Sequence, residues 1–176
     1  MNEASPWILR FAHLIAPGSN VLDLACGRGR HTRYFTGRGC KVTAVDIDIG
    51  AVSGLAGVEA IKADLENGDG WPLAGRQFDA VIVTNYLWRP LLPDIIAATA
   101  PQGVLLYETF GRGNEKFGKP SSPAFLLNPG ELPSAVQGVL QVVAYEHGRI
   151  TSPKAAIVQR ICAVNSDEAA YISGRE

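Results

Sequence analysis

Residues 20–48 constrain the fold of this chain more than any other segment. Their pattern predicts a buried strand, a glycine turn, a helix and a second strand that ends in a carboxylate. A strand that leads through a glycine turn into a helix is the first half of a nucleotide-binding α/β unit. Gly27 and Gly29 let the backbone approach a ligand closely, and the following helix presents free N–H groups to it. The segment therefore predicts a ligand site directly after the first strand.

Strands and helices alternate along most of the chain. Apolar runs predict strands over residues 21–25, 42–45, 58–62, 78–84 and 103–107. Helical spacing and stop signals predict helices over residues 5–16, 30–37, 48–56, 91–100 and 131–136. Because parallel strands connected through helices are covered on both faces, this order indicates a parallel sheet between two helical layers.

The pattern changes in the last third of the chain. Residues 111–129 carry Gly, Pro, Ser and Asn without a clear period, which predicts a long loop of the kind that is usually functional. Two apolar runs, 139–145 and 155–164, are joined by the turn 147–153, which predicts an antiparallel hairpin. We therefore predict an α/β fold: one doubly wound, Rossmann-like domain over residues 1–176, with a seven-stranded mixed sheet that ends in the antiparallel hairpin.

Length and charge limit the possible functions. With 176 residues the chain has room for one domain with a proper core. The net charge is −1 and no basic run occurs, so nucleic acid is not expected as a partner. No apolar stretch reaches the roughly 20 residues that span a bilayer, and the N-terminus lacks the pattern of a signal peptide. We expect a cytoplasmic protein without membrane contact.

The cysteines predict neither a disulfide framework nor a metal site. Cys26, Cys40 and Cys162 are odd in number, none lies in a CxxC, and no His/Cys cluster has ligand spacing. Such usage is typical of a reduced compartment, and no metal is expected. Cys26 lies inside the glycine turn, where a small residue that fits a close turn is favoured over a nucleophile.

Three acids follow the first three strands. Asp23 precedes the glycine turn, Asp46 ends the second strand and Asp64 follows the third. The carboxyl ends of parallel strands form the edge at which open α/β sheets bind ligands. An acid at the end of the second strand can accept both ribose hydroxyls, and Asp64 is suited to an adenine amino group.

The same residues separate two cofactor classes. A dinucleotide fingerprint needs a third glycine or an alanine where this chain has Thr32, and Asp23 would lie near two phosphate charges. S-adenosylmethionine (SAM) has no phosphate and carries a sulfonium and an ammonium, so a carboxylate nearby is attractive. The residues therefore favour SAM over NAD.

The order of these segments resembles the class I SAM-dependent methyltransferases. The matching segments are VLDLACGRG, AVDID, IKADL and FDAVIVTNYL. Three more, CGRGRH, LYETFGRGNEKFG and FLLNPGEL, resemble small bacterial methyltransferases of the tellurite-resistance type. The resemblance covers nearly the whole chain and implies the fold, whose seventh strand is antiparallel, and the cofactor SAM, but not the acceptor. Many members carry a third glycine where Ala25 stands.

The resemblance implies a set of cofactor contacts. These are Asp23, Ala25, Gly27 and Gly29 around the methionine part, with Cys26 in the same turn; Asp46 at the ribose; Ile47, Asp64 and Leu65 at the adenine; and Asn85 at the methyl-transfer end. Arg30 opens the helix after the turn and is expected to pair with the cofactor carboxylate. The alternative for Arg30 is a solvated surface arginine.

The acceptor is expected beyond strands four and five and in the loop after them. The candidate acceptor-binding residues are His31, Tyr86, Trp88, Arg89, Arg112 and Phe117, with Lys116 in the same loop. The candidate catalytic residues are Asn85, Glu108 and Tyr107. Trp88 as a packing residue and Glu108 as a plain surface residue are alternatives of similar weight, and His31 is favoured as a capping or cofactor contact over a base. The N-terminal helix over residues 5–16 is a possible lid, with Trp7 as its anchor in the other interpretation.

The function predicted from the sequence is methyl transfer from SAM to a small-molecule or small-anion acceptor. The segment after strand four reads Asn85-Tyr86-Leu87-Trp88 and lacks the Asn-Pro-Pro-aromatic pattern, which disfavours bases and glutamine as acceptors. A non-catalytic SAM- or nucleotide-binding regulatory module is the alternative, and an NAD-linked oxidoreductase comes third. A monomer or a homodimer is expected.

Overall fold

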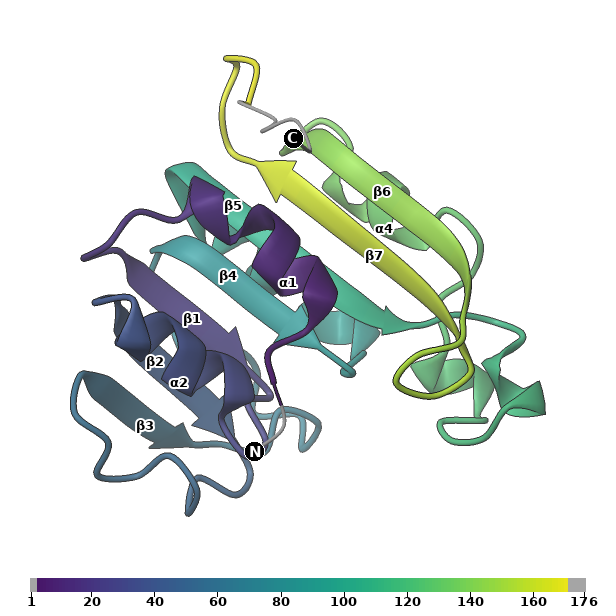
Figure 1. The fold of residues 1–176 in the computed structure, drawn as a ribbon, viewed down its shortest axis with the longest axis horizontal. Coiled ribbons are helices and arrows are strands. Elements are labelled where there is room, and N and C mark those ends of the chain that lie inside the picture. The colour runs from purple at the N-terminus through teal and green to yellow at the C-terminus, as the bar shows by residue number, and fades with distance from the viewer. Residues whose placement is uncertain (1–2, 171–176) are drawn as a thin grey trace.

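A seven-stranded sheet runs through the molecule in the order β3-β2-β1-β4-β5-β7-β6 (Figure 1). The computed structural model describes residues 3–170. The strands are β1 (Asn20–Leu24), β2 (Lys41–Asp46), β3 (Val58–Lys62), β4 (Phe78–Thr84), β5 (Thr99–Phe110), β6 (Gln141–Ile150) and β7 (Ala156–Val164). Strands β1 to β5 pair in parallel, and β7 lies antiparallel between β5 and β6. The predicted seven-stranded mixed sheet with its antiparallel C-terminal hairpin is confirmed.

Helices cover both faces of this sheet, as the alternation predicted. The α-helices are α1 (Pro6–Phe11), α2 (Arg30–Gly37), α3 (Leu92–Ala97) and α4 (Glu131–Val136). Four 3₁₀ turns join them: η1 (Ala12–Leu14), η2 (Arg89–Leu91), η3 (Asn114–Lys116) and η4 (Pro123–Phe125). Helices α1 and α2 lie on the face toward the viewer in Figure 1, and α4 lies behind the sheet.

Each face of the sheet has its own apolar core, because neighbouring side chains of a strand point to opposite faces. Val21 and Ile82 pack with α1 and α2 on one face. Leu22 and Val83 pack with α3 and α4 on the other. Central strands that are buried on both faces explain why the first and fourth strands have nearly continuous apolar sequences.

The N-terminal helix is shorter than predicted and is part of the core. Ser5 caps it by accepting a hydrogen bond from the Trp7 N–H at 3.2 Å, and regular helix ends at Phe11, where η1 begins. Trp7, Ile8 and Phe11 are buried, and the Trp7 indole N–H donates to the Ile161 carbonyl at 3.2 Å. Trp7 is therefore an anchor. The lid function of residues 5–16 stays a prediction.

Two predicted helices differ from the structure. Residues 48–56 form consecutive turns instead of a helix, because Asp48 accepts the Gly50 N–H and Gly54 has a left-handed φ of 80°. The helix predicted over 91–100 is α3 alone, and Thr99 already belongs to β5. Local side-chain and sheet hydrogen bonds replace helical ones at both places.

The hairpin and the long loop before it form one wall beside the end of β5. Strand β6 continues through Ile150, so the connection to β7 is only residues 151–155 and the turn predicted over 147–153 is displaced. The loop returns to the sheet where the Leu127 N–H donates to the Phe110 carbonyl at 2.9 Å. Buried Asn114 accepts the Ile157 N–H at 3.2 Å and so ties the loop to the hairpin.

The two turn glycines form a matched pair for a stability test. A Cβ on Gly29 would lie 2.2 Å from Val52 Cγ1, whereas a Cβ on Gly27 would meet nothing within 4 Å. Both residues have positive φ, so either Ala variant carries a cost of about 1–2 kcal/mol. Gly29→Ala should lose about 1–3 kcal/mol more in unfolding free energy, because it also overpacks the core. Denaturant unfolding measures both, and equal losses would contradict the geometry.

Candidate active site

The site lies where the strand order reverses. Strands β1 and β4 are neighbours, but the chain continues outward from β1 to β2 and from β4 to β5. Ala25 follows β1 with φ 53°, and Asn85 follows β4 with φ 56°. Left-handed backbone costs a non-glycine residue about 1–2 kcal/mol and collects at functional sites. The two strands thus leave the sheet in strained conformations on both sides of the crevice where doubly wound folds bind ligands.

The glycine turn is fixed to the end of the second strand. The Gly27 N–H donates to Asp46 Oδ2 at 2.8 Å, and the Asp48 N–H donates to Asp46 Oδ1 at 3.0 Å. These bonds orient the Asp46 carboxylate between the turn and β2. Each oxygen keeps a further lone pair for a hydroxyl. Because the space beside Gly27 is open, a ligand can approach its backbone.

Asp23 differs from the prediction that it contacts the cofactor directly. Its side chain is only 1% exposed, and its Oδ2 accepts both the Thr32 N–H at 2.8 Å and the Thr32 hydroxyl at 2.5 Å. The carboxylate therefore ties β1 to the first turn of α2. Burial raises the Asp23 pKa from its ordinary 3.8 to about 6, although the Thr32 hydrogen bonds oppose this. Asp23 shapes the turn from within the core and does not line the crevice.

The residues predicted at the adenine lie around the ends of β2 and β3 and differ in exposure. Ile47 is 59% exposed, which is unusual for a large aliphatic side chain that follows a buried strand. Asp64 is exposed and accepts the Glu66 N–H at 2.9 Å, and Leu65 is buried beside it. Nearby, the Tyr86 hydroxyl is buried and has no hydrogen-bond partner among residues 3–170. Burial raises its pKa, and the charges of Glu66 and Asp64 add to the effect.

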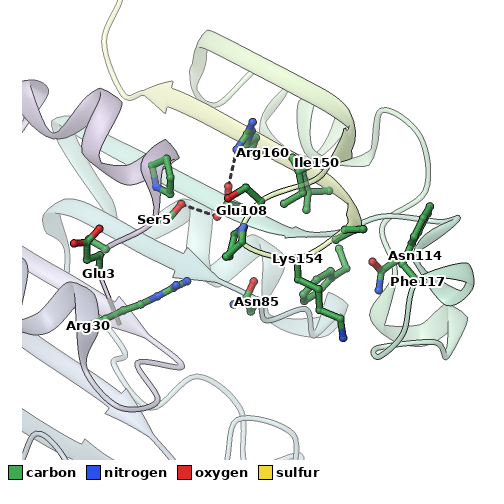
Figure 2. Close-up of a pocket in the computed structure, with 18 of the residues that line it drawn as sticks. Glu3, Ser5, Arg30, Asn85, Glu108, Asn114, Phe117, Ile150, Lys154 and Arg160 are labelled. Atoms are coloured by element: carbon green, nitrogen blue, oxygen red, sulfur yellow. Dashed lines mark hydrogen bonds and ion pairs between the residues drawn. The ribbon is translucent and has the colours of Figure 1, made fainter. Parts of the chain in front are cut away.

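A cavity of about 700 Å³ adjoins this crevice at the ends of β4 and β5 (Figure 2). Its lining comes from the segment before α1, the start of α2, the ends of β4 and β5, the loop 111–129 and the hairpin of β6 and β7. Figure 2 shows Arg30 and Glu3 on one side, Phe117 and Asn114 on the other, and Asn85 between them. Of the predicted site residues, the cavity brings together Arg30, Asn85, Glu108 and Phe117.

Glu108 is held in the cavity wall by two donors. The Ser5 hydroxyl donates to Glu108 Oε1 at 2.7 Å, and Arg160 Nη1 lies 3.1 Å from Oε2. Arg160 is itself fixed, because it also pairs with Glu146 at 2.8 Å and lies 5.2 Å from the Trp7 ring centroid. Glu108 is thus an ordered, ion-paired carboxylate. The alternative interpretation of the sequence, a plain surface residue, does not describe it.

Arg30 and His31 are neighbours in the chain, but Arg30 lines the cavity and His31 is buried. Arg30 reaches from the start of α2 toward Asn85, and its Nη2 lies 3.5 Å from the Thr84 hydroxyl. His31 is buried and accepts the Ser5 N–H at Nε2, 3.2 Å away. Burial, together with the charge of Arg30, lowers the His31 pKa from 6.5 to about 3. His31 is therefore a neutral, buried residue that joins α2 to the N-terminal segment, which agrees with a capping role, and its contact with the acceptor stays a prediction.

Three other predicted site residues, Tyr107, Arg89 and Trp88, do not line the cavity. Tyr107 is 1% exposed, and its hydroxyl donates to the Tyr86 carbonyl at 2.9 Å, so it does not line the cavity and its catalytic role stays a prediction. Arg89 is committed to Glu131 at 2.6 Å and to two loop carbonyls. Trp88 packs against the core, which was the alternative interpretation.

Two further residues lie outside the cavity for similar reasons. The Arg112 Nε donates to Asn128 Oδ1 at 2.6 Å, on the exposed side of the loop. The Cys26 thiol is buried, and burial raises its pKa to about 12, with the charges of Asp23 and Asp46 adding to this. Cys26 is therefore a small packing residue in the turn and not a nucleophile.

Sequence reasoning missed three residues that organise the site. Thr32 is the partner of Asp23, and Ser5 joins the N-terminal segment to both His31 and Glu108. Arg160 supplies the counter-charge of Glu108. A serine at the start of a predicted helix is a typical N-cap, and an arginine inside an apolar strand signals a buried acidic partner, so both residues had a sequence signal. Within residues 3–170, no group of ligand-type side chains is arranged to hold a metal, and no helix has the length and apolarity to cross a membrane.

Comparison with known proteins agrees with this geometry. Residues 21–103 match the family model of a methyltransferase domain. Malonyl-[acyl-carrier protein] O-methyltransferase of Enterobacter lignolyticus is 33% identical over 100 residues, which is 52% of this chain and 39% of that protein. Its Salmonella typhimurium counterpart is 30% identical over 108 residues, 54% of this chain and 41% of that one. The chain spans about two fifths of the length of these relatives.

Solved structures show the same fold. TehB from Haemophilus influenzae superposes with a TM-score of 0.72 at 19% identity and covers 92% of this chain and 62% of that one. The 1,6-didemethyltoxoflavin-N1-methyltransferase of Burkholderia thailandensis, solved with S-adenosylhomocysteine, gives 0.66 at 24% identity, over 92% of this chain and 76% of that one. The methyltransferase-domain match over residues 21–103 and the fold shared with these solved methyltransferases therefore agree with each other.

The buried Asp23 predicts a specific pH dependence. Its folded pKa lies above its unfolded value, so its contribution to stability is present below pH 4 and lost as pH rises through about 6. Asp23→Asn keeps an acceptor for Thr32 but cannot ionise. Between pH about 3.5 and about 7, the unfolding free energy of the wild type should therefore fall relative to the variant by up to about 3 kcal/mol.

Denaturant unfolding at several pH values measures this difference. Asp79→Asn, at an exposed acid near the amino end of β4, is the control for an Asp→Asn substitution outside the site. A constant difference between the wild type and Asp23→Asn would contradict the buried carboxylate.

Proposed function

We propose that this protein transfers a methyl group from SAM to a small-molecule acceptor. The observation that supports this most is the junction of two spaces: the crevice beside Gly27 and Asp46, and the cavity of about 700 Å³. Arg30 and Asn85 lie where the two meet. A cofactor in one space and an acceptor in the other would bring donor and nucleophile together at this junction, as methyl transfer requires.

The residues of the crevice fit SAM. The open space at Gly27 suits a ligand that lies along the turn, and the oriented Asp46 carboxylate suits the ribose hydroxyls. The exposed Ile47 side chain suits the face of an adenine ring, with Asp64 and Leu65 at its edge. Arg30 suits the carboxylate of the methionine part. The Asp46 carboxylate beside the turn would repel a phosphate, which disfavours a dinucleotide in this place.

When bound, SAM supplies a methyl group on a positively charged sulfur, so the chain's own residues mainly align the acceptor and exclude water. Asn85 has a left-handed backbone conformation, and its side chain lines the cavity. The backbone N–H of Asn85 donates to the Glu108 carbonyl at 2.8 Å. Glu108 Oε1 accepts from the Ser5 hydroxyl and can accept instead from an O–H or N–H of the acceptor. These two residues would position the nucleophile, and Glu108 can take its proton where it has one.

Binding and turnover separate this function from its alternatives. Calorimetry should detect binding of SAM and S-adenosylhomocysteine and none of NAD. Mass spectrometry of a cell extract treated with the protein and isotopically labelled SAM should then reveal a methylated small molecule. Cofactor binding without any labelled product would favour a regulatory binding module, and binding of NAD alone would refute both.

Asp46→Ala tests the ribose assignment. Loss of a charge-assisted contact to two hydroxyls should cost about 1.5–3 kcal/mol of S-adenosylhomocysteine binding. Asp79→Ala is the control, because it removes an exposed acid at the amino end of the sheet. Calorimetry measures both affinities. Equal affinities for wild type and Asp46→Ala would contradict the assignment.

A further inference from the structure

Positive side chains outnumber negative ones in the cavity lining, and only some of them are paired. The lining holds four cationic side chains, Arg30, Lys119, Lys154 and Arg160, and two carboxylates, Glu3 and Glu108. Arg160 and Glu108 form an ion pair and so offset one another. The remaining lining charge is therefore positive, in a chain whose net charge is −1. A cavity with such a charge attracts an anionic ligand.

The two lysines of the lining, Lys154 and Lys119, belong to the hairpin connection and to the loop 111–129. A Cβ placed on Gly118 would be 3.3 Å from the Lys154 ammonium, so this charge lies beside the loop 111–129. Lys119 follows in the same loop. Figure 2 places Lys154 between Asn85 and the loop residues Asn114 and Phe117, whereas Arg30 lies on the other side of Asn85. Arg30 is thus at the cofactor side and Lys154 at the far side, beside the loop that also carries Lys119.

This far wall is built by contacts between the hairpin and the loop. The Arg149 guanidinium lies 4.8 Å from the Phe117 ring centroid. Asn114, 2% exposed, accepts the Ile157 N–H and donates to the Pro120 carbonyl at 3.0 Å. The segments that carry Lys154 and Lys119 are thus fixed to one another, which keeps both cations at one end of the cavity.

Much of the remaining lining is apolar. Phe110 and Val158 line it from the paired strands β5 and β7, and Ile150 and Ala156 line it from the hairpin. A volume of about 700 Å³ is in the range of sites for small organic molecules and far exceeds that of a simple inorganic anion. Such a surface stabilises the apolar body of a ligand through its removal from water.

We propose that the acceptor is a small organic acid, with an apolar body against Phe110 and Val158 and a carboxylate bound by Lys154 and Lys119. Its nucleophilic atom would then lie at the opposite end, beside Asn85 and Glu108, so the carboxylate anchors the molecule and is not the methylated group. This proposal rests on the proposed function and adds the substrate class. It also assigns specificity to the hairpin connection, residues 151–155.

Matched probes test the proposal. The probes are 4-hydroxybenzoate, anthranilate and indole-3-acetate, each beside its carboxamide, which has the same shape without the charge. Calorimetry in the presence of saturating S-adenosylhomocysteine measures their binding. We expect at least one acid to bind about tenfold or more tightly than its amide, as for a charge-assisted hydrogen bond to a partly exposed partner.

Lys154→Gln should remove most of this preference and leave the affinity for S-adenosylhomocysteine unchanged. Lys41→Gln, at an exposed lysine on the amino end of β2, is the control and should preserve the preference. Equal binding of acids and amides, no binding of any acid, or a preference that survives Lys154→Gln would overturn the proposal while the proposed function stands. Absence of S-adenosylhomocysteine binding would refute the proposed function itself.

Discussion

The hydrogen bonds between the Asp23 carboxylate and Thr32 are the interaction on which the site depends. They join the end of β1 to the first turn of α2, on the two sides of the glycine turn. A buried carboxylate is costly unless it is bonded, and here both donors come from one residue. With β1 and α2 fixed, residues 25–29 have little freedom, and the left-handed conformations of Ala25, Gly27 and Gly29 follow.

This fixed turn gives the open edge of the sheet two distinct halves. On the side of β2 and β3 lie the oriented Asp46 carboxylate and the exposed Ile47, where we propose that the nucleoside binds. On the side of β5, the N-terminal segment, the loop and the hairpin enclose a cavity. Ser5 connects the halves, because it bonds both His31 on α2 and Glu108 on β5. Under the proposed function, the cofactor and the acceptor would be bound by separate parts of the chain.

The fold was largely predictable, because apolar runs and turn residues act locally. The bounds predicted for α2, β3, β4 and α4 agree with the structure, whereas the helix over 48–56 does not form where Asp48 and Gly54 favour turns. Side-chain roles were less predictable, because they depend on direction. Glu108 and Arg30 do line the cavity, but their neighbours along the chain, Tyr107 and His31, are buried. The cation at Lys154 had no local signal, since tertiary folding alone brings the hairpin to the site.

A crystal structure of the protein with S-adenosylhomocysteine tests the central claim most directly. The account predicts the ribose hydroxyls on Asp46, the adenine against Ile47, and the sulfur directed toward Asn85 and the cavity, with the Asp23–Thr32 hydrogen bonds intact. A ligand bound elsewhere, or a crevice closed by core side chains while the ligand stays in solution, would contradict it.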